Sequence, residues 1–131
     1  MERYQDYVIK NGKFVGKFEE MYQTFDNPWH QKDVVQNSYA RHATLLSIKN
    51  SSVKSLIEVG CGLGTFTNYL VENLPGIKIG GMDVSETAIK KAKAKYVHID
   101  FAQGDLRHFS EGLADERVCG GGGMTLFCLL R

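Results

Sequence analysis

One stretch near the middle of the chain, residues 55–67, constrains the fold more than any other. It reads Ser-Leu-Ile-Glu-Val-Gly-Cys-Gly-Leu-Gly-Thr-Phe-Thr. The apolar run at 56–59 is typical of a buried parallel strand, and a new helical period begins after the glycines. Glycine adopts positive φ and has no side chain to block a ligand, while the first amides of a helix lack partners inside the helix. The stretch predicts a strand, a glycine turn and a helix, with a ligand over residues 60–64.

Two classes of ligand suit a glycine turn after a first strand. A dinucleotide site also has glycines there, with an acidic residue about 20 positions further on. This chain instead has Gly-x-Gly-x-Gly, and Thr65 and Thr67 stand where a third dinucleotide glycine is expected. Glu58 places a carboxylate at the mouth of the strand, where it repels phosphate and suits an amino or sulfonium group. The pattern favours a cationic ligand, with NAD as the alternative.

Three motifs in order resemble those of the class I S-adenosylmethionine-dependent methyltransferases. The segment 58–64, Glu-Val-Gly-Cys-Gly-Leu-Gly, resembles the first motif of that family. Asp83 ends a second apolar run, 77–82, and resembles the acid that takes both ribose hydroxyls. Asp105 resembles the acid that accepts from the adenine amino group, with the amide of Leu106 facing the ring. The resemblance covers roughly residues 54–109.

The resemblance implies a site for S-adenosylmethionine around these motifs. The residues it assigns to the cofactor are Glu58, Gly60, Cys61, Gly62, Gly64, Asp83, Val84, Asp105 and Leu106. Trp29 lies in a turn, Asp-Asn-Pro-Trp at 26–29, that resembles the Asp-Pro-Trp turn of some small-molecule methyltransferases, including sugar-modifying ones, whose N-terminal segment folds over the cofactor. Arg41 resembles the arginine that grips the methionine carboxylate in some relatives, a bidentate task that suits a guanidinium. The alternative for Trp29 is that its ring packs only against the base of the adjoining helix cap. The alternative for Arg41 is a solvated position on the surface.

The hydrophobic periods predict the elements around this site. Phe14, Phe18, Met21, Tyr22 and Phe25 recur at helical spacing and predict an amphipathic helix that starts at Phe14. A second helix is expected over 31–49, and a third begins after Ser85 as its N-cap. The second helix is expected to bury Val35, Ser38, Tyr39, His42, Leu45, Leu46 and Ile48. In the third, Lys90, Lys91, Lys93 and Lys95 are expected to form a solvated face.

The predicted fold is α/β, a Rossmann-like three-layer sandwich with a mostly parallel sheet of three or four strands. Residues 1–53 form an N-terminal helical cap, and residues 54–131 form the cofactor-binding domain with an incomplete C-terminal half. The two parts are expected to make one compact unit. Met124 to Leu130 is an apolar run of strand length, interpreted as a fourth strand that pairs beside residues 56–59. A homodimer contact or a partner chain is the other way to cover that exposed sheet edge.

Composition argues against several other classes of protein. The net charge is +1, which offers no field to attract a nucleic acid, and no run of 18 apolar residues exists to span a membrane. Three cysteines in unrelated settings provide neither a disulfide framework nor metal-ligand spacing. A reducing cytoplasm and no metal are therefore expected.

The sequence predicts methyl transfer from S-adenosylmethionine to an oxygen or nitrogen of a small-molecule acceptor. Sugar derivatives are among the candidate acceptors. The sulfonium is an activated leaving group, so alignment and desolvation suffice and no catalytic residue is assigned. Two alternatives stay open. The chain is a non-catalytic S-adenosylmethionine-binding fragment or subunit, since the resemblance stops near Phe109, or it is an NAD-dependent oxidoreductase, which leaves Asp105 without a role.

Overall fold

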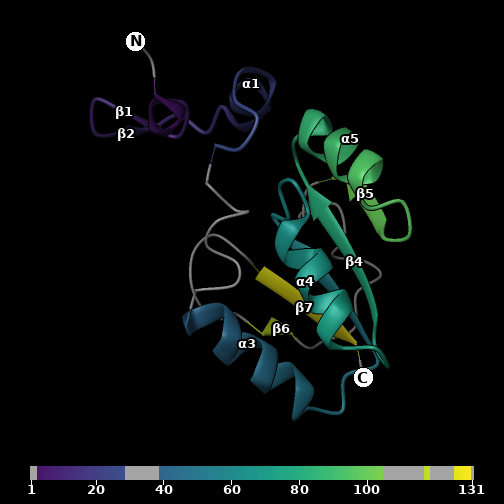
Figure 1. Ribbon diagram of the computed structural model, residues 1–131. Helices are drawn as coiled ribbons and strands as arrows, with labels where there is room; N and C mark the ends of the chain where they lie inside the picture. The colour runs from purple at the N-terminus through teal and green to yellow at the C-terminus, as the bar shows by residue number, and fades with distance from the viewer. Residues whose placement is uncertain (1–2, 29–38, 105–116, 119–125, 131) are drawn as a thin grey trace.

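The computed structural model describes residues 3–28, 39–104, 117–118 and 126–130 (Figure 1). The N-terminal part consists of the 3-10 helix η1 (Tyr4–Tyr7), the strands β1 (Ile9–Lys10) and β2 (Lys13–Phe14), and the helix α1 (Phe18–Thr24). The helix α3 (Tyr39–Lys49) follows. The remaining elements are β3 (Ser55–Val59), α4 (Thr65–Asn73), β4 (Lys78–Asp83), α5 (Glu86–Lys95), β5 (Asp100–Gln103), β6 (Arg117–Val118) and β7 (Leu126–Leu130).

The main sheet has the strand order β5-β4-β3-β7-β6. β3, β4 and β5 are parallel neighbours, whereas β7 pairs antiparallel with β3 from Ser55↔Leu130 to Val59↔Leu126. The expected α/β fold with parallel strands is therefore present, although the sheet in the described residues has five strands and the prediction was three or four. The C-terminal strand pairs beside β3 as predicted, and it covers the edge for which a partner chain was the alternative.

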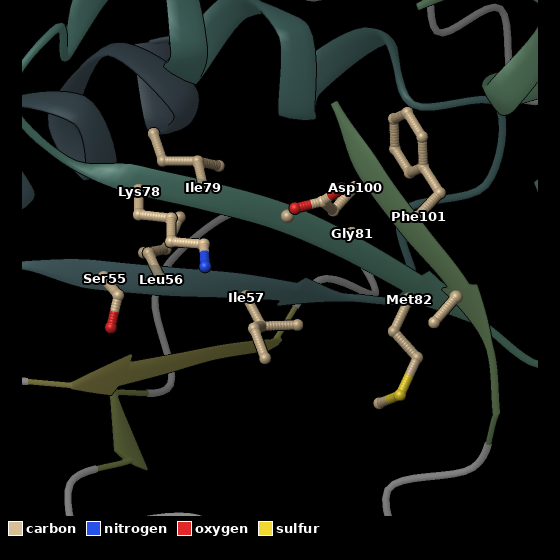
Figure 2. Close-up of a pocket in the computed structure, with 11 residues that line it drawn as sticks. Ser55, Leu56, Ile57, Lys78, Ile79, Gly81, Met82, Asp100 and Phe101 are labelled. Atoms are coloured by element: carbon tan, nitrogen blue, oxygen red, sulfur yellow. The ribbon is translucent and has the colours of Figure 1, made fainter. Parts of the chain in front are cut away.

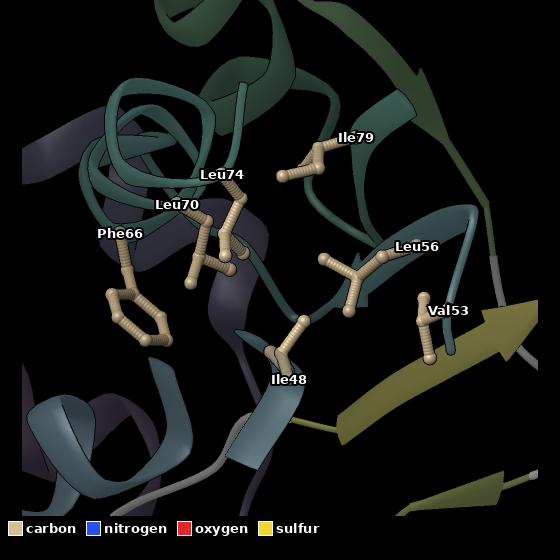
Figure 3. Packing of buried hydrophobic residues seen from close by; sticks show 7 residues of the cluster. All are labelled: Ile48, Val53, Leu56, Phe66, Leu70, Leu74 and Ile79. Carbon is tan, nitrogen blue, oxygen red and sulfur yellow. The ribbon is translucent and has the colours of Figure 1, made fainter. Parts of the chain in front are cut away.

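The helices α3, α4 and α5 pack against one face of this sheet. Leu56 and Ile79, which are register partners on β3 and β4, contact Leu70 of α4 and Ile48 of α3 in one buried cluster (Figure 3). The cluster also contains Val53, Phe66 and Leu74. Each fully buried leucine of this kind stabilises the fold by about 1.5 to 3 kcal/mol. Both crossovers, β3-α4-β4 and β4-α5-β5, run between neighbouring parallel strands in the same direction, so a common hand places α4 and α5 on the same face.

Two adjacent glycines allow β4 and β5 to lie close together. A Cβ on Gly80 would lie 2.9 Å from the carbonyl oxygen of Asp100, and a Cβ on Gly81 would lie 2.8 Å from the Phe101 ring. Glycine inside a strand is typical of such a close approach by a neighbouring backbone.

The first helix begins later than its hydrophobic period predicts. Phe14 lies in β2 and is 72% exposed, because Asn11 and Gly12 adopt positive φ of 52° and 73° and turn the chain back into a hairpin. Gly16, at φ +66°, then separates the hairpin from α1. Met21 and Tyr22 of α1 are buried as the period suggested.

The buried face of α3 also differs from the prediction. Tyr39 is 88% exposed and Leu46 57% exposed, and His42 is exposed as well. Ile48 is buried and Leu45 partly buried as predicted, whereas Thr44 is buried and Arg41 partly buried without having been predicted. The helix is therefore rotated relative to the predicted face. Val35 and Ser38 lie outside the described residues. In the part of the chain that the structure describes, no helix is long and apolar enough to cross a membrane.

Candidate cofactor site

Two turns meet at the carboxyl ends of β3 and β4. The glycine turn (residues 60–64) follows β3, and the acidic turn (residues 83–85) closes β4. The amides of Gly60 and Cys61 both donate to the carbonyl oxygen of Met82, at 2.7 and 3.0 Å. Gly60, Gly62 and Gly64 have φ of 78°, 56° and 80°, which L side chains rarely adopt. The glycine turn is thus fixed against β4 by its own backbone.

The Asp83 carboxylate joins the two turns. The Gly62 amide donates to Asp83 Oδ2 at 2.8 Å, and the Ser85 amide donates to Asp83 Oδ1 at 2.9 Å. Burial raises the pKa of Asp83, although the backbone amides of Ser85, Gly62 and Val84 oppose that shift. One amide on each oxygen sets the plane of the carboxylate and leaves further lone pairs on both oxygens. Asp83 can therefore accept two more hydrogen bonds from a ligand.

Glu58 provides a second carboxylate behind the glycine turn. It is 1% exposed, and the Thr67 hydroxyl of α4 donates to its Oε1 at 2.6 Å. Burial raises the pKa of Glu58 to about 7, against the lowering effects of Thr67 and of the Arg41 charge. The negative charge of Asp83 adds to the rise. A cation placed at this point would favour ionised Glu58.

Arg41 reaches the same region from α3. Its guanidinium carbon lies 4.7 Å from the centroid of the Phe66 ring, a cation-π arrangement that holds the side chain on α4. Burial lowers the pKa of Arg41, and the charge of Glu58 opposes that change. The structure therefore brings Arg41 and Glu58 together, although they are 17 positions apart in the sequence.

The remaining predicted residues fall into two groups. The Cys61 thiol is buried in the core beside α5, where burial raises its pKa, so the thiol does not face the site. Val84 is 48% exposed at the acidic turn. Trp29, Asp105 and Leu106 lie outside the described residues. The Gly104 amide donates to the carbonyl oxygen of Asp83 at 2.9 Å, so the residue before Asp105 is held at the acidic turn.

The contacts that Glu19, Thr87 and Lys91 make beside this site were not predicted from the sequence. Glu19 of α1 accepts from the backbone and hydroxyl of Thr87, and Lys91 donates to the carbonyl oxygen of Tyr22 at 2.8 Å. Lys91 is therefore not simply part of a solvated face. Its partner is 69 positions away, and Glu19 and Thr87 are 68 positions apart, so no local pattern signals these contacts. Among the described residues, no cluster of three or more His, Cys, Asp or Glu side chains could hold a metal ion.

A separate hollow lies on the sheet face opposite the helices. Its volume is about 330 Å³, and Figure 2 shows Ile57 and Met82 projecting from the other side of the sheet than Ile79 and Phe101. Lys78 and Asp100 also line it, whereas residues 60–64 do not. This hollow is therefore distinct from the candidate cofactor site at the strand ends.

Comparison with known proteins connects this geometry to one class. The profile of a family described as "Methyltransferase domain" matches residues 57–118, which span the glycine turn and the acidic turn. The structure is similar to that of DesVI from Streptomyces venezuelae, with a TM-score of 0.53, 19% identity, and coverage of 70% of this chain and 39% of DesVI. It is also similar to the plantazolicin methyltransferase BamL in complex with a triazolic analogue and SAH, with a TM-score of 0.54, 22% identity, and coverage of 74% and 38%.

Curated sequences give the same class. Trans-aconitate 2-methyltransferase of Azoarcus sp. (strain BH72) is 26% identical over 84 residues, which are 64% of this chain and 33% of the relative. Putative methyltransferase 235L of Invertebrate iridescent virus 6 is 32% identical over 80 residues, or 54% and 30% of the two chains. The chain thus spans about a third of the length of these relatives. The profile match over residues 57–118 and the shared fold support a class I S-adenosylmethionine-dependent methyltransferase domain in this chain.

Proposed function

We propose that this chain takes part in methyl transfer from S-adenosylmethionine to an oxygen or nitrogen of a small-molecule acceptor. The observation that carries the proposal is the Asp83 carboxylate, which backbone amides of both turns hold in a fixed plane beside the glycine turn. A ribose has two hydroxyl donors, and a carboxylate with free lone pairs on both oxygens is a suitable acceptor pair. The similarity of residues 57–118 to a methyltransferase domain makes S-adenosylmethionine the nucleoside to test first.

The other site residues suit the methionine end of the cofactor. Glu58 is a buried carboxylate that an ammonium group would help to ionise, and Arg41 offers a guanidinium for a carboxylate. We assign Asp105 and Leu106 to the adenine, and Trp29 to a contact over the cofactor. Gly60, Gly62 and Gly64 would let the cofactor approach the backbone closely. Together with Asp83, these features suit one molecule that carries a ribose, a base and an amino acid.

The cofactor, when bound, supplies a methyl group on a sulfonium that is already a good leaving group. The residues of this chain then need only bind, orient and exclude water. The two turns meet this need because amides of the glycine turn donate to the Met82 carbonyl oxygen and to the Asp83 carboxylate. We assign no general base. For the acceptor, trans-aconitate is a first compound to test, because several relatives are named for it.

The test is isothermal titration of the purified chain with S-adenosylhomocysteine, beside a titration with NAD. Micromolar binding to S-adenosylhomocysteine and none to NAD is the expected result. Binding to NAD alone would contradict the proposal. If neither ligand binds, this chain does not form a working nucleoside site, and the proposed function fails for it.

Replacing Asp83 separates its role in binding from its role in the fold. Asp83→Ala is expected to weaken S-adenosylhomocysteine binding by about 1 to 3 kcal/mol, because the ribose hydroxyls lose their buried acceptor. Titration calorimetry on the folded variant measures this, and Asp100→Ala is the matched control, since Asp100 lies on the neighbouring strand at the separate hollow. An Asp83 variant with the affinity of the wild type would remove Asp83 from the site.

A further inference from the structure

Helix α1 contacts both turns of the candidate site. Met21 and Tyr22 are 0% and 3% exposed and share a buried cluster with Leu63 and Ala88. Leu63 belongs to the glycine turn, and Ala88 lies in the first turn of α5, directly after the acidic turn. Figure 1 shows α1 beside α5, at the end of the molecule away from α3. One short helix from the N-terminal part therefore bridges the two loops on which the cofactor would lie.

Glu19 fixes the start of α1 to the start of α5. Its Oε1 and Oε2 accept from the Thr87 amide at 3.1 and 3.3 Å, and Oε1 also accepts from the Thr87 hydroxyl. The first amides of a helix have no partner inside the helix, and a negative charge at that end is favourable. Although burial opposes the change, hydrogen bonds from the Thr87 and Ser85 side chains hold the pKa of Glu19 below its usual value. The carboxylate is thus held in its ionised form.

Lys91 fixes the other end of α1. Its ammonium donates to the carbonyl oxygen of Tyr22 at 2.8 Å and lies 3.7 Å from Asp26 Oδ1. Lys91 is one helical turn after Thr87, so both anchors are on the same side of α5. The Asp26 pair is exposed and contributes little. The contact to Tyr22 and the Glu19 contact together hold α1 at two points.

These anchors act on the same segment that presents Asp83. Asp83 Oδ1 accepts from the Ser85 amide, Ser85 Oγ accepts from the Ala88 amide at 3.1 Å, and Glu19 accepts from Thr87 between them. We propose that Glu19 is a positioning residue for the cofactor, which holds α1 across both turns and so orders the acidic turn and Leu63 before the ligand binds. This inference rests on the proposed function, because it assigns Glu19 a role in that same site.

Variants at position 19 test the inference through ligand affinity. Glu19→Ala is expected to weaken S-adenosylhomocysteine binding by about five- to twentyfold, because the ligand must then order both turns itself. Glu19→Gln is expected to recover most of the affinity, since its amide oxygen can still accept from the Thr87 amide. Glu20→Ala is the matched control, because it removes an acid from the exposed side of the same helix. Thr87→Val combined with Glu19→Ala is expected to cost less than the sum of the two.

Amide hydrogen exchange distinguishes positioning from general stabilisation. In the ligand-free Glu19→Ala variant, amide exchange is expected to rise in residues 60–64 and 83–88, while the core of β3 and α4 keeps its protection. Binding of S-adenosylhomocysteine is expected to restore the protection of residues 60–64 and 83–88. Unchanged affinity, or a uniform loss of protection across the chain, would overturn the inference. The ligand-free exchange pattern tests Glu19 even if the wild type binds no S-adenosylhomocysteine. A wild type that binds no S-adenosylhomocysteine would contradict the proposed function but not the role of Glu19 in ordering the turns.

Discussion

Gly64→Ala is expected to lower the free energy of unfolding by about 2 to 5 kcal/mol. Two separate costs add at this position. Gly64 has φ +80°, where an L side chain costs about 1 to 2 kcal/mol. A Cβ there would also lie 2.6 Å from Phe101 Cζ and 3.2 Å from Ala92 Cβ, at the point where α4, α5 and β5 meet. Overpacking of this kind typically costs a further 1 to 3 kcal/mol, roughly.

Two other glycines separate these costs in the same urea or thermal unfolding experiment. Gly12 has φ +73° with nothing within 4 Å of its Cβ position, so Gly12→Ala reports the backbone cost alone. Gly76 has open space around it and no positive φ, so Gly76→Ala is the reference. Phe101→Leu is expected to recover part of the loss in the Gly64→Ala background, because the shorter side chain removes the ring. A Gly64→Ala cost equal to that of Gly12→Ala would show that the Phe101 contact is unimportant.

Local patterns were enough to predict the centre of the fold. The strand, glycine turn and helix at 55–67, the acid at position 83 and the Ser85 cap each depend on residues that are close in sequence. The Ser85 hydroxyl accepts from the Ala88 amide as an N-cap should. The position of the candidate site could therefore be predicted from the sequence, because parallel strands bring the ends of two local motifs to one edge of the sheet.

The N-terminal part was harder to predict, for a physical reason. Hydrophobic period reports which residues are apolar, but Gly16 and the Asn11-Gly12 turn decide where α1 begins, and Phe14 is left exposed. In α3 the polar Thr44 is buried and the apolar Leu46 is exposed, because packing on α4 fixes the rotation of the helix. Glu19 and Lys91 contact Thr87 and Tyr22, which are 68 and 69 positions away in the sequence. Such long-range contacts leave no spacing that a single sequence reveals.

Glu58 is expected to make the stability of the ligand-free protein fall as pH rises. Its pKa is 4.5 as an ordinary glutamate and about 7 in the fold, because it is buried away from water. Between these values the unfolded chain releases the proton that the folded chain still holds, so folding becomes less favourable with rising pH. Below pH 4.5 both states are protonated, and above about 7 both are ionised. The shift corresponds to about 3 kcal/mol, lost between those limits.

The comparison with Glu58→Gln isolates this contribution, since glutamine has no charge at any pH in this range. Asp83, Glu19 and Asp6 also have shifted pKa values, in different directions, but they are common to both proteins. The difference in unfolding free energy between wild type and variant is therefore expected to change by about 3 kcal/mol between pH 4.5 and 7. Thr67→Val removes the hydrogen bond that favours ionised Glu58, so the fall is expected to extend to higher pH. A difference that stays constant across this range would mean that Glu58 is ionised in the folded protein, with Arg41 compensating its charge fully.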